Sequence, residues 1–207
     1  MIEKQIHLET ADMSIDDAVL VERCRRGDSE AMGRLILKYQ DRIYNTILKM
    51  CANADDAAEL TQETFVKVIE SIERFAGRSS FYTWVFRIAV NLTLNHCQRS
   101  RRVGYWSLDA ESDDYEGQAQ SQLKGVLSDD SSPDPALVAE NKELCRIVGK
   151  ALAKLDDDHR TVIVLRDVEG MNYAQIAEVL KVELGTVKSR LSRARSNLRE
   201  VLERMLP

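Results

Sequence analysis

The chain has 207 residues, of which 44% are hydrophobic, 6% aromatic and 30% charged, and its formal net charge is −5. The hydrophobic fraction is sufficient for a packed core, and the low numbers of glycines (9) and prolines (3) favour an all-α fold over a β fold. The longest apolar runs are too short to cross a membrane, and the first residues lack the basic start and apolar core of a signal peptide, so we expect no membrane insertion.

Helices are predicted throughout the N-terminal part of the chain, which we take as one domain over residues 15–104. Apolar residues recur there at helical spacing, and polar loops separate the periodic runs. The expected segments, in chain order, are a loose arm at 1–14, helical periodicity from Ser14 to Met50, a helix at 57–74, a loop at 77–80 and a helix at 81–99. The predicted core positions of the last two helices are Leu60, Phe65, Val68, Ile69, Ile72, Phe81, Val85, Ile88 and Leu92.

A second helical domain is predicted at residues 136–207, after a linker. Residues 105–135 are rich in Ser, Asp, Gly and Gln and have little periodicity, which is typical of a flexible segment. The helices expected after it cover 136–155, 160–167, 173–180 and a basic stretch that starts near Thr186. The chain is therefore predicted to be all-α, with two helical domains joined by a flexible acidic linker.

Charge is distributed unevenly along the chain. Residues 74–102 contain six arginines and no acid, and residues 181–207 contain seven cations and three acids. Between them, residues 108–136 contain eight acids and one lysine. Two basic segments indicate contact with nucleic acid, although the negative net charge alone argues against it.

The stretch from Tyr173 to Arg199 has the pattern of a helix–turn–helix. In its second helix, apolar residues from Val187 to Leu198 form one stripe, which holds the helix to its domain. The residues that point away from this stripe are Thr186, Ser189, Arg190 and Arg193. Thr186 is expected to cap the helix and to leave backbone N–H groups near a phosphate, so this face is predicted to read duplex DNA.

The helix predicted at 81–99 also has a polar face, and this face is suited to single-stranded nucleic acid. Its members recur at helical spacing and are Trp84, Arg87, Asn91, Asn95, Gln98 and Arg102. Aromatic rings stack on unpaired bases, arginines hold phosphates, and the loop at 77–82 can receive an extruded base. The alternative is that the aromatic residues are core. We favour the core for Phe81 and a nucleic-acid surface for Trp84 with Arg87.

Both predicted domains resemble the extracytoplasmic-function (ECF) sigma factors of the sigma-70 family. The −10-reading and promoter-melting part of that family is similar to FAGRSSFYTWVFRIAVNLTLNHCQRSRR, and the preceding polymerase-docking helix to DDAAELTQETFVKVIESI. The −35-reading domain is similar to LDDDHRTVIVLRDVEGMNYAQIAEVLKVELGTVKSRLSRAR. The sequence departs from the family at Asp156 and Glu183, where proline is frequent, and at Lys181, where glycine is frequent.

The resemblance implies a cytoplasmic sigma factor that binds core RNA polymerase, melts the −10 element and reads the −35 duplex. The implied −10 contacts are Arg74, Arg78, Ser80, Tyr82, Trp84, Arg87, Asn91, Asn95, Arg99 and Arg102. The implied −35 contacts are Leu184, Thr186, Lys188, Ser189, Arg190 and Arg193. The implied contacts with the β′ clamp helices of the polymerase are Asp56, Glu59, Gln62, Glu63 and Lys67. Further implied partners are the polymerase β flap, promoter DNA and an anti-sigma factor.

Catalysis, metal binding and cofactor binding are not indicated by the sequence. His7, His96 and His159 are dispersed, and the four cysteines are scattered as reduced thiols usually are. For the acidic run at 55–73, the alternative to a polymerase contact is an ordinary solvent-exposed helix face. Two other functions remain open: a stand-alone helix–turn–helix regulator, which needs a dimer interface, and a DNA-modifying enzyme, which needs an acid or metal cluster.

Overall fold

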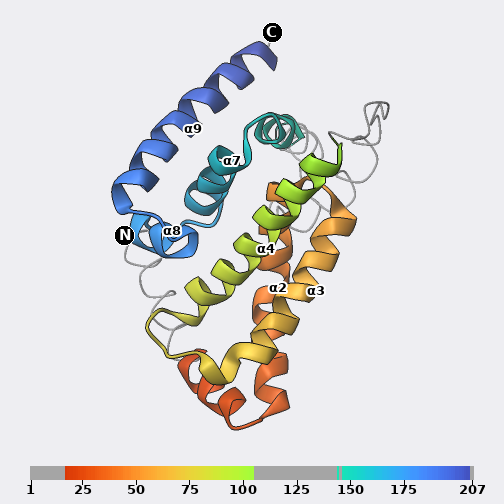
Figure 1. Ribbon diagram of the computed structural model, residues 1–207, viewed down its shortest axis with the longest axis vertical. Coiled ribbons are helices and arrows are strands. Elements are labelled where there is room, and N and C mark those ends of the chain that lie inside the picture. The colour runs from red at the N-terminus through yellow and green to blue at the C-terminus, as the bar shows by residue number, and fades with distance from the viewer. Residues whose placement is uncertain (1–16, 105–143, 145, 206–207) are drawn as a thin grey trace, which may run out of the picture.

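The computed structural model describes residues 17–104, 144 and 146–205, which we divide into an N-terminal half (17–104) and a C-terminal half (144–205). In these residues every regular element is a helix, so the predicted all-α class is confirmed (Figure 1). The predicted arm at 1–14 and the predicted linker at 105–135 lie outside the described residues.

The N-terminal half begins with a helix at residues 17–25. The elements that follow are α2 (Ser29–Cys51), α3 (Ala54–Ser71), the 3-10 turn η1 (Ile72–Arg74) and α4 (Phe81–Gly104). Asp28 caps α2 and Asn53 caps α3, each by accepting hydrogen bonds from two backbone N–H groups of the first turn. The predicted periodicity up to Met50 is interrupted, because Gly27 has a left-handed φ of 84° between the first helix and α2.

The C-terminal half contains a helix at residues 146–153 and four further elements. These are α7 (Asp157–Ile163), the π-helical turn η4 (Val164–Val168), α8 (Tyr173–Leu180) and α9 (Leu184–Met205). Asp156 caps α7, and Asn172 and Gln175 form a capping box at the start of α8. Lys181 ends α8 with a left-handed φ of 54°, a conformation that glycine adopts more readily.

Thr186 does not cap the basic helix, contrary to the prediction. The helix α9 begins at Leu184, so Thr186 already lies in its first turn. The backbone N–H of Thr186 donates to the carbonyl of Glu183 at 2.9 Å. The same carbonyl accepts from the N–H of Val187 at 3.2 Å, so the first turn of the helix forms ahead of Thr186.

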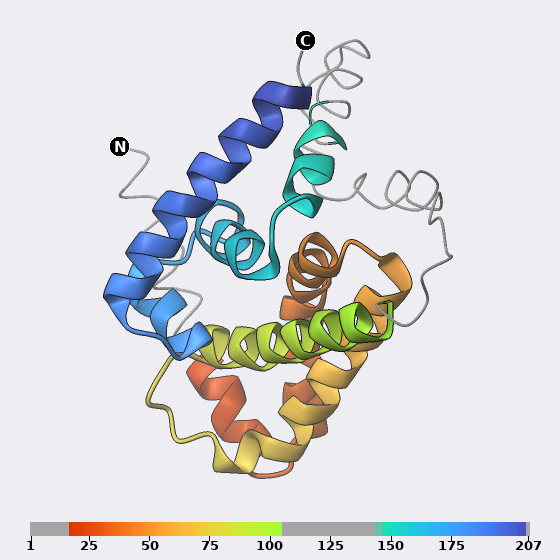
Figure 2. The ribbon, with the colours of Figure 1, turned by 45° about the horizontal axis from the view of Figure 1, so that its top comes forward.

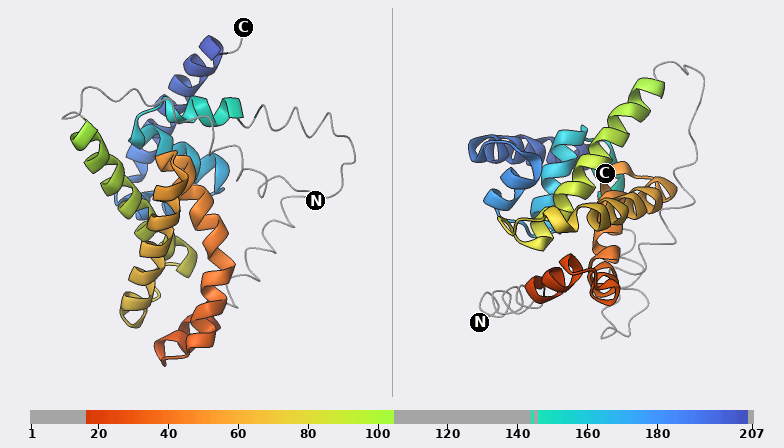
Figure 3. Two further views of the ribbon diagram at one scale, coloured as in Figure 1. Left: turned by 90° about the vertical axis from the view of Figure 1, so that its right-hand side faces the viewer. Right: turned by 60° about the horizontal axis from the view of Figure 1, so that its bottom comes forward.

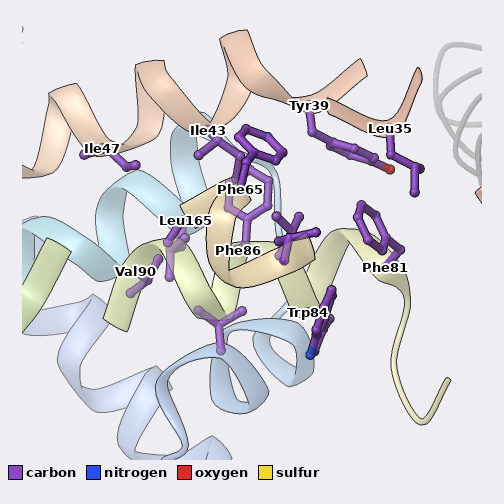
Figure 4. Close-up of a cluster of buried hydrophobic side chains, with 14 of the residues drawn as sticks. Leu35, Tyr39, Ile43, Ile47, Phe65, Phe81, Trp84, Phe86, Val90 and Leu165 are labelled. Atoms are coloured by element: carbon purple, nitrogen blue, oxygen red, sulfur yellow. The ribbon is translucent and has the colours of Figure 1, made fainter. Parts of the chain in front are cut away.

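The main core lies where α2, α3 and α4 meet (Figure 4). Its largest fully buried side chains in the N-terminal half include Leu35, Tyr39, Ile43, Ile47 and Phe86. The predicted core residues Leu60, Phe65, Val68, Ile72, Phe81 and Val85 are buried, and Ile88 and Leu92 are half-buried against them. The prediction is wrong for Ile69, whose side chain points away from the core and is 50% exposed.

The two halves are packed against each other, which the sequence pattern did not predict. Leu165, Met171 and Ile176 of the C-terminal half are fully buried in the same cluster as the α2–α4 core. In Figure 2, α4 lies between α3 on one side and α8 on the other. The left view of Figure 3 shows the C-terminal end of α9 at the opposite end of the molecule from the first turns of α2. The described residues therefore form one closed arrangement of two halves.

Candidate nucleic-acid interface

The first turns of α9 carry the polar face predicted for duplex DNA. Val187, Leu191 and Ala194 are buried and hold α9 against α7 and α8. The predicted contacts on the other side are exposed or half-buried, namely Leu184, Thr186, Lys188, Ser189, Arg190 and Arg193. The major groove of DNA accepts a helix that carries polar and basic side chains on its first turns and is supported by another helix behind it.

One arginine of this face has a partner inside the C-terminal half. The guanidinium of Arg190 lies 3.3 Å from the carboxylate of Asp158, and the two side chains are 31% and 58% exposed. Exposed ion pairs contribute only about 0.2–1 kcal/mol. A phosphate can therefore replace Asp158 as the partner of Arg190 at little cost in free energy.

The residues predicted for the −10 strand come from η1, the loop after it and α4, and the structure brings them together only in part. Six of them are exposed: Arg74, Arg78, Ser80, Asn91, Asn95 and Arg99. Arg102 belongs to the last turn of α4. Tyr82 and Arg87 are half-buried, and Trp84 is buried.

Trp84 does not lie on the free face of α4 that the helical spacing predicted. Its side chain is buried with 8% exposure, and its ring centroid lies 4.9 Å from that of Phe75 and 5.7 Å from that of Phe81. Figure 4 shows Trp84 beside Phe81 at the start of α4. A large apolar ring gains more from this aromatic cluster than from solvent. In this arrangement Trp84 is therefore not available to stack on a base.

Tyr82 and Arg87 are covered by side chains and backbone of the C-terminal half. The phenol of Tyr82 donates to the carbonyl of Glu169 at 3.3 Å, and burial raises the pKa of this phenol, which keeps it a donor. The guanidinium of Arg87 lies 3.5 Å from the carboxylate of Glu178 in α8. Two residues predicted to contact the −10 strand are thus occupied within the chain.

Glu169 forms the main polar contact between the halves, and we call it with Arg42, Thr46 and Tyr82 the Glu169 bridge. Its carboxylate is 5% exposed and accepts hydrogen bonds from Arg42 Nε and from Thr46 Oγ1, each at 2.7 Å. Its backbone carbonyl accepts a further bond from Arg42 Nη2 at 3.0 Å. Sequence reasoning missed this residue, because a glutamate before Gly170 looks like an ordinary helix end.

A pocket of about 490 Å³ opens beside the Glu169 bridge. The N-terminal half lines it with the loop that was predicted to receive an extruded base, including Gly77, Ser80 and Tyr82. The C-terminal half contributes Glu169 and Gln175 to the same wall. The predicted base-receiving loop therefore faces a space that the C-terminal half partly closes.

The exposed face of α3 carries the residues predicted to contact the polymerase. Glu59, Gln62, Glu63 and Lys67 are exposed, and Asp56 is half-buried. Two apolar side chains lie on the same helix surface, Val66 at 46% exposure and Ile69 at 50%. Exposed apolar groups among charges are typical of a protein-binding surface. Sequence reasoning missed Ile69 here because its spacing placed it in the core.

Metal-binding clusters of three or more His, Cys, Asp or Glu side chains are absent from the described part of the chain. In that part, no helix is long and apolar enough to cross a membrane. Burial raises the pKa of the Cys24 and Cys97 thiols and raises that of Cys51 to about 11, so these cysteines are protonated at neutral pH.

Two family models match the chain in succession. Residues 35–103 match Sigma-70 region 2, and residues 145–198 match Sigma-70, region 4. The chain is 37% identical to the RNA polymerase sigma-H factor of Pseudomonas aeruginosa, over 92% of this chain and 95% of that protein. It is 34% identical to the ECF RNA polymerase sigma-E factor of Escherichia coli, over 87% of this chain and 91% of that protein.

Two solved structures have a similar fold. CnrH in complex with the cytosolic domain of CnrY aligns with a TM-score of 0.63 at 24% identity, over 91% of this chain and 97% of that chain. The sigma factor RpoE of Bartonella quintana, in complex with the anti-sigma factor NepR, aligns with a TM-score of 0.57 at 24% identity, over 83% of this chain and 96% of that chain.

Proposed function

The chain belongs to the extracytoplasmic-function group of the sigma-70 family, and from this premise we propose how its two halves divide the work of transcription initiation. As a sigma factor it binds core RNA polymerase and directs initiation at specific promoters. The observation that carries this conclusion is the order of the two matches, region 2 over residues 35–103 and region 4 over residues 145–198, each with a polar face of its own.

Region 4 reads the −35 duplex with the first turns of α9. The support is the exposed polar face opposite the buried stripe of Val187, Leu191 and Ala194. Lys188 and Arg193 are exposed and can reach bases or phosphates at once, whereas Arg190 exchanges Asp158 for the DNA. The residues that we assign to this contact are Leu184, Thr186, Lys188, Ser189, Arg190 and Arg193.

Region 2 opens the −10 element and holds the unpaired strand along α4 and the loop before it. The basic composition of residues 74–102 and the exposed amides of Asn91 and Asn95 support this assignment. Arg87 and Tyr82 belong to the same surface but are engaged by the C-terminal half in the closed arrangement. Their use on DNA therefore requires that the two halves separate.

The α3 face binds the β′ clamp helices of the polymerase, and region 4 contacts the β flap. Exposed acidic residues beside Val66 and Ile69 support a protein partner for α3. The chain performs no chemistry of its own, since the polymerase supplies it, and it acts in the cytoplasm, where the polymerase is. An anti-sigma factor regulates it, as NepR is bound to the sigma factor of Bartonella quintana.

A reconstituted transcription assay tests the function. Purified bacterial core polymerase, genomic DNA fragments and this protein are combined, and the 5′ ends of the transcripts are sequenced. We expect discrete starts that appear only with the protein and share two upstream elements. Arg193→Ala should reduce these starts, while Arg199→Ala, an exposed arginine farther along α9, serves as the matched control. Absence of protein-dependent starts and of polymerase binding contradicts the proposal.

A further inference from the structure

Gly185 lies in the first turn of α9, on the side of the helix that faces away from the rest of the chain. The helix begins at Leu184, so Gly185 is its second residue, and it is exposed. At about 3.6 residues per turn, position 185 lies opposite the buried stripe of α9 and one turn before Ser189. Gly185 therefore shares the face that we assign to the −35 duplex.

The fold itself does not require a glycine at this position. Gly27, Gly77 and Gly170 have a left-handed φ, which glycine adopts without strain, but Gly185 is not among the positive-φ glycines of the described residues. A Cβ atom added at Gly185 would have no atom of the surrounding fold within 4 Å. Glycine is also one of the least favourable residues in a helix. An alanine would therefore fit at position 185 without strain inside the chain.

Leu184, beside Gly185, also indicates a close contact at this turn. Its side chain is 42% exposed, and it is the only exposed large apolar side chain among the described residues of α9. Removing apolar surface from water is favourable, so contact with a partner is better for this side chain than solvent. The major groove offers apolar as well as polar groups, because each thymine presents a methyl group there.

The depth to which α9 enters the major groove decides which of its side chains reach the bases. The groove is about 12 Å wide and a helix with its side chains is about 10–12 Å across, so the fit is tight. A side chain on the outward side of the first turn would hold the helix away from the base edges. Ser189 Oγ donates to the carbonyl of Thr186 at 3.0 Å, so this short side chain stays close to the helix backbone. It can reach a base only if the backbone of the first turns comes close to the DNA.

Resting on the function proposed above, we propose that Gly185 is a positioning residue for −35 recognition. Its missing side chain lets the first turn of α9 enter the major groove deeply enough for Ser189 and Arg193 to reach base edges. Contacts with base edges carry the sequence information, whereas phosphate contacts supply affinity for any duplex. Gly185 thus acts on sequence discrimination rather than on binding of DNA in general.

Side chains of increasing size at position 185 test this role. The variants are Gly185→Ala and Gly185→Leu, since alanine and leucine both favour a helix. The matched controls are Gly149→Ala and Gly149→Leu in the helix at 146–153. Gly149 is likewise exposed, and an added Cβ atom there likewise has no neighbour within 4 Å. In Figures 1 and 2 that helix lies away from the first turns of α9.

Each full-length variant is assembled with core polymerase, and fluorescence anisotropy measures its binding to two labelled duplexes. One is a promoter fragment found by transcript sequencing, and the other is the same fragment with a scrambled −35 element. The ratio of the two affinities is the −35 discrimination. Gly185→Ala should lower this ratio about threefold to tenfold and Gly185→Leu about tenfold to a hundredfold, while both Gly149 variants keep the parent ratio. The midpoint of thermal unfolding, followed by circular dichroism, should not fall in Gly185→Ala or Gly185→Leu.

A double-mutant cycle tests whether Gly185 acts through base contacts. Arg193→Ala should lower the −35 discrimination of the parent. It should have little further effect in Gly185→Leu, because the arginine no longer reaches the bases in that variant. If the two substitutions lower the discrimination independently, the positioning role is overturned.

The remaining outcomes separate this role from the proposed function. If the parent discriminates and the Gly185 variants discriminate equally well, the positioning role is overturned and the −35 assignment stands. If Gly185→Leu loses discrimination together with thermal stability, the positioning role is also overturned, because the glycine then serves the fold. If the parent itself binds both duplexes equally, the −35 assignment fails and the role of Gly185 fails with it.

Discussion

The two polar faces that we assign to promoter DNA differ in how far the rest of the chain covers them. The face on the first turns of α9 is supported from behind by α7 and α8 and is open to solvent. The face at the start of α4 is covered in part, at Tyr82 by the carbonyl of Glu169 and at Arg87 by Glu178 of α8, although these lie far from it in sequence. Under the proposed assignment, the −35 face is open to DNA, and part of the −10 face contacts the other half.

In the proposed function, this difference bears on the order in which the two faces meet DNA. Duplex reading needs only a helix face on a rigid support, so it is compatible with the closed arrangement. The residues proposed to hold the unpaired strand include Tyr82, Arg87 and the pocket-lining loop, all of which contact or face the C-terminal half. Region 4 thus carries the proposed −35 face and covers part of the proposed −10 face.

The largest effect is expected from removing the residue that keeps the C-terminal half rigid. The guanidinium of Arg160 donates to the carbonyls of Leu152, Ala153 and Leu155 at 3.0, 2.9 and 2.8 Å and also to that of Met50 in α2. Arg160→Ala should lower the free energy of unfolding by about 3–5 kcal/mol, because it leaves four carbonyls without the donor that binds them. Urea denaturation followed by circular dichroism measures this change.

Arg199→Ala is the control for Arg160→Ala, since an exposed arginine should change stability by no more than about 0.5 kcal/mol. If Arg160→Ala loses equally little, the carbonyls have found other donors. The C-terminal half would then be too adaptable to act as a rigid cover for α4.

The next effect concerns the open face. Arg190→Ala should weaken holoenzyme binding to the −35 duplex by about 1–3 kcal/mol, because an arginine at a groove contributes a strong charge-assisted contact. Filter binding with a promoter found by transcript sequencing measures it. Asp158→Asn is the matched control, since it only frees Arg190 from its internal partner and should keep or raise affinity. Equal binding by Arg190→Ala and the parent removes Arg190 from the −35 contact.

The sequence was sufficient for those features that depend on neighbours along the chain. The stripe of Val187, Leu191 and Ala194 and the all-α class follow from helical spacing, and the structure confirms both. Even Lys181 ends α8 where a turn was expected. These features are set within a few turns of one helix, which a periodic pattern describes well.

Features that depend on residues outside the helix itself could not be derived in this way. Trp84 had the spacing of a free face, but Phe75 and Phe81 cover it through the fold of the preceding loop. Glu169 had no distinguishing pattern, because its partners Arg42 and Thr46 lie in a helix more than a hundred residues earlier. Helical periodicity separates the apolar face of one helix from its polar face. It does not show which residues from elsewhere in the chain cover the polar face.

A smaller effect is expected at the covered face. Arg87→Ala should reduce strand opening about fivefold to tenfold, less than a free arginine would, because the residue must first leave Glu178. Permanganate reactivity of unpaired thymines in the promoter complex measures the opening. Glu178→Gln is the control and should increase opening, since it releases Arg87 without removing it. Loss of polymerase binding by Arg87→Ala would instead assign this arginine to the polymerase contact.

The smallest expected effect is on the alkylation rate of Cys97, which reports whether the C-terminal half lies against α4. Burial, together with the nearby Asp157 carboxylate, raises the pKa of this thiol, and Asp157 belongs to the C-terminal half. A raised pKa in the closed state means that the proton is held more tightly there, so the closed state loses stability relative to the open one as pH rises above the ordinary thiol range. Alkylation by iodoacetamide, which requires the thiolate, should accordingly be slow at neutral pH and increase toward alkaline pH.

Opening the chain should make this alkylation a few-fold faster at one pH, because the thiol gains water and moves away from Asp157. The alkylation rates of Glu169→Lys, which places a cation beside Arg42, are compared with those of Asp167→Lys, which makes the same charge change at an exposed carboxylate of the C-terminal half. Mass spectrometry follows each cysteine separately. Cys24 is the internal control, since it is buried at 6% exposure in the N-terminal half and should keep its rate in both variants. A faster rate at Cys24 as well as Cys97 indicates general loosening, whereas a change confined to Cys97 places the opening where the C-terminal half meets α4.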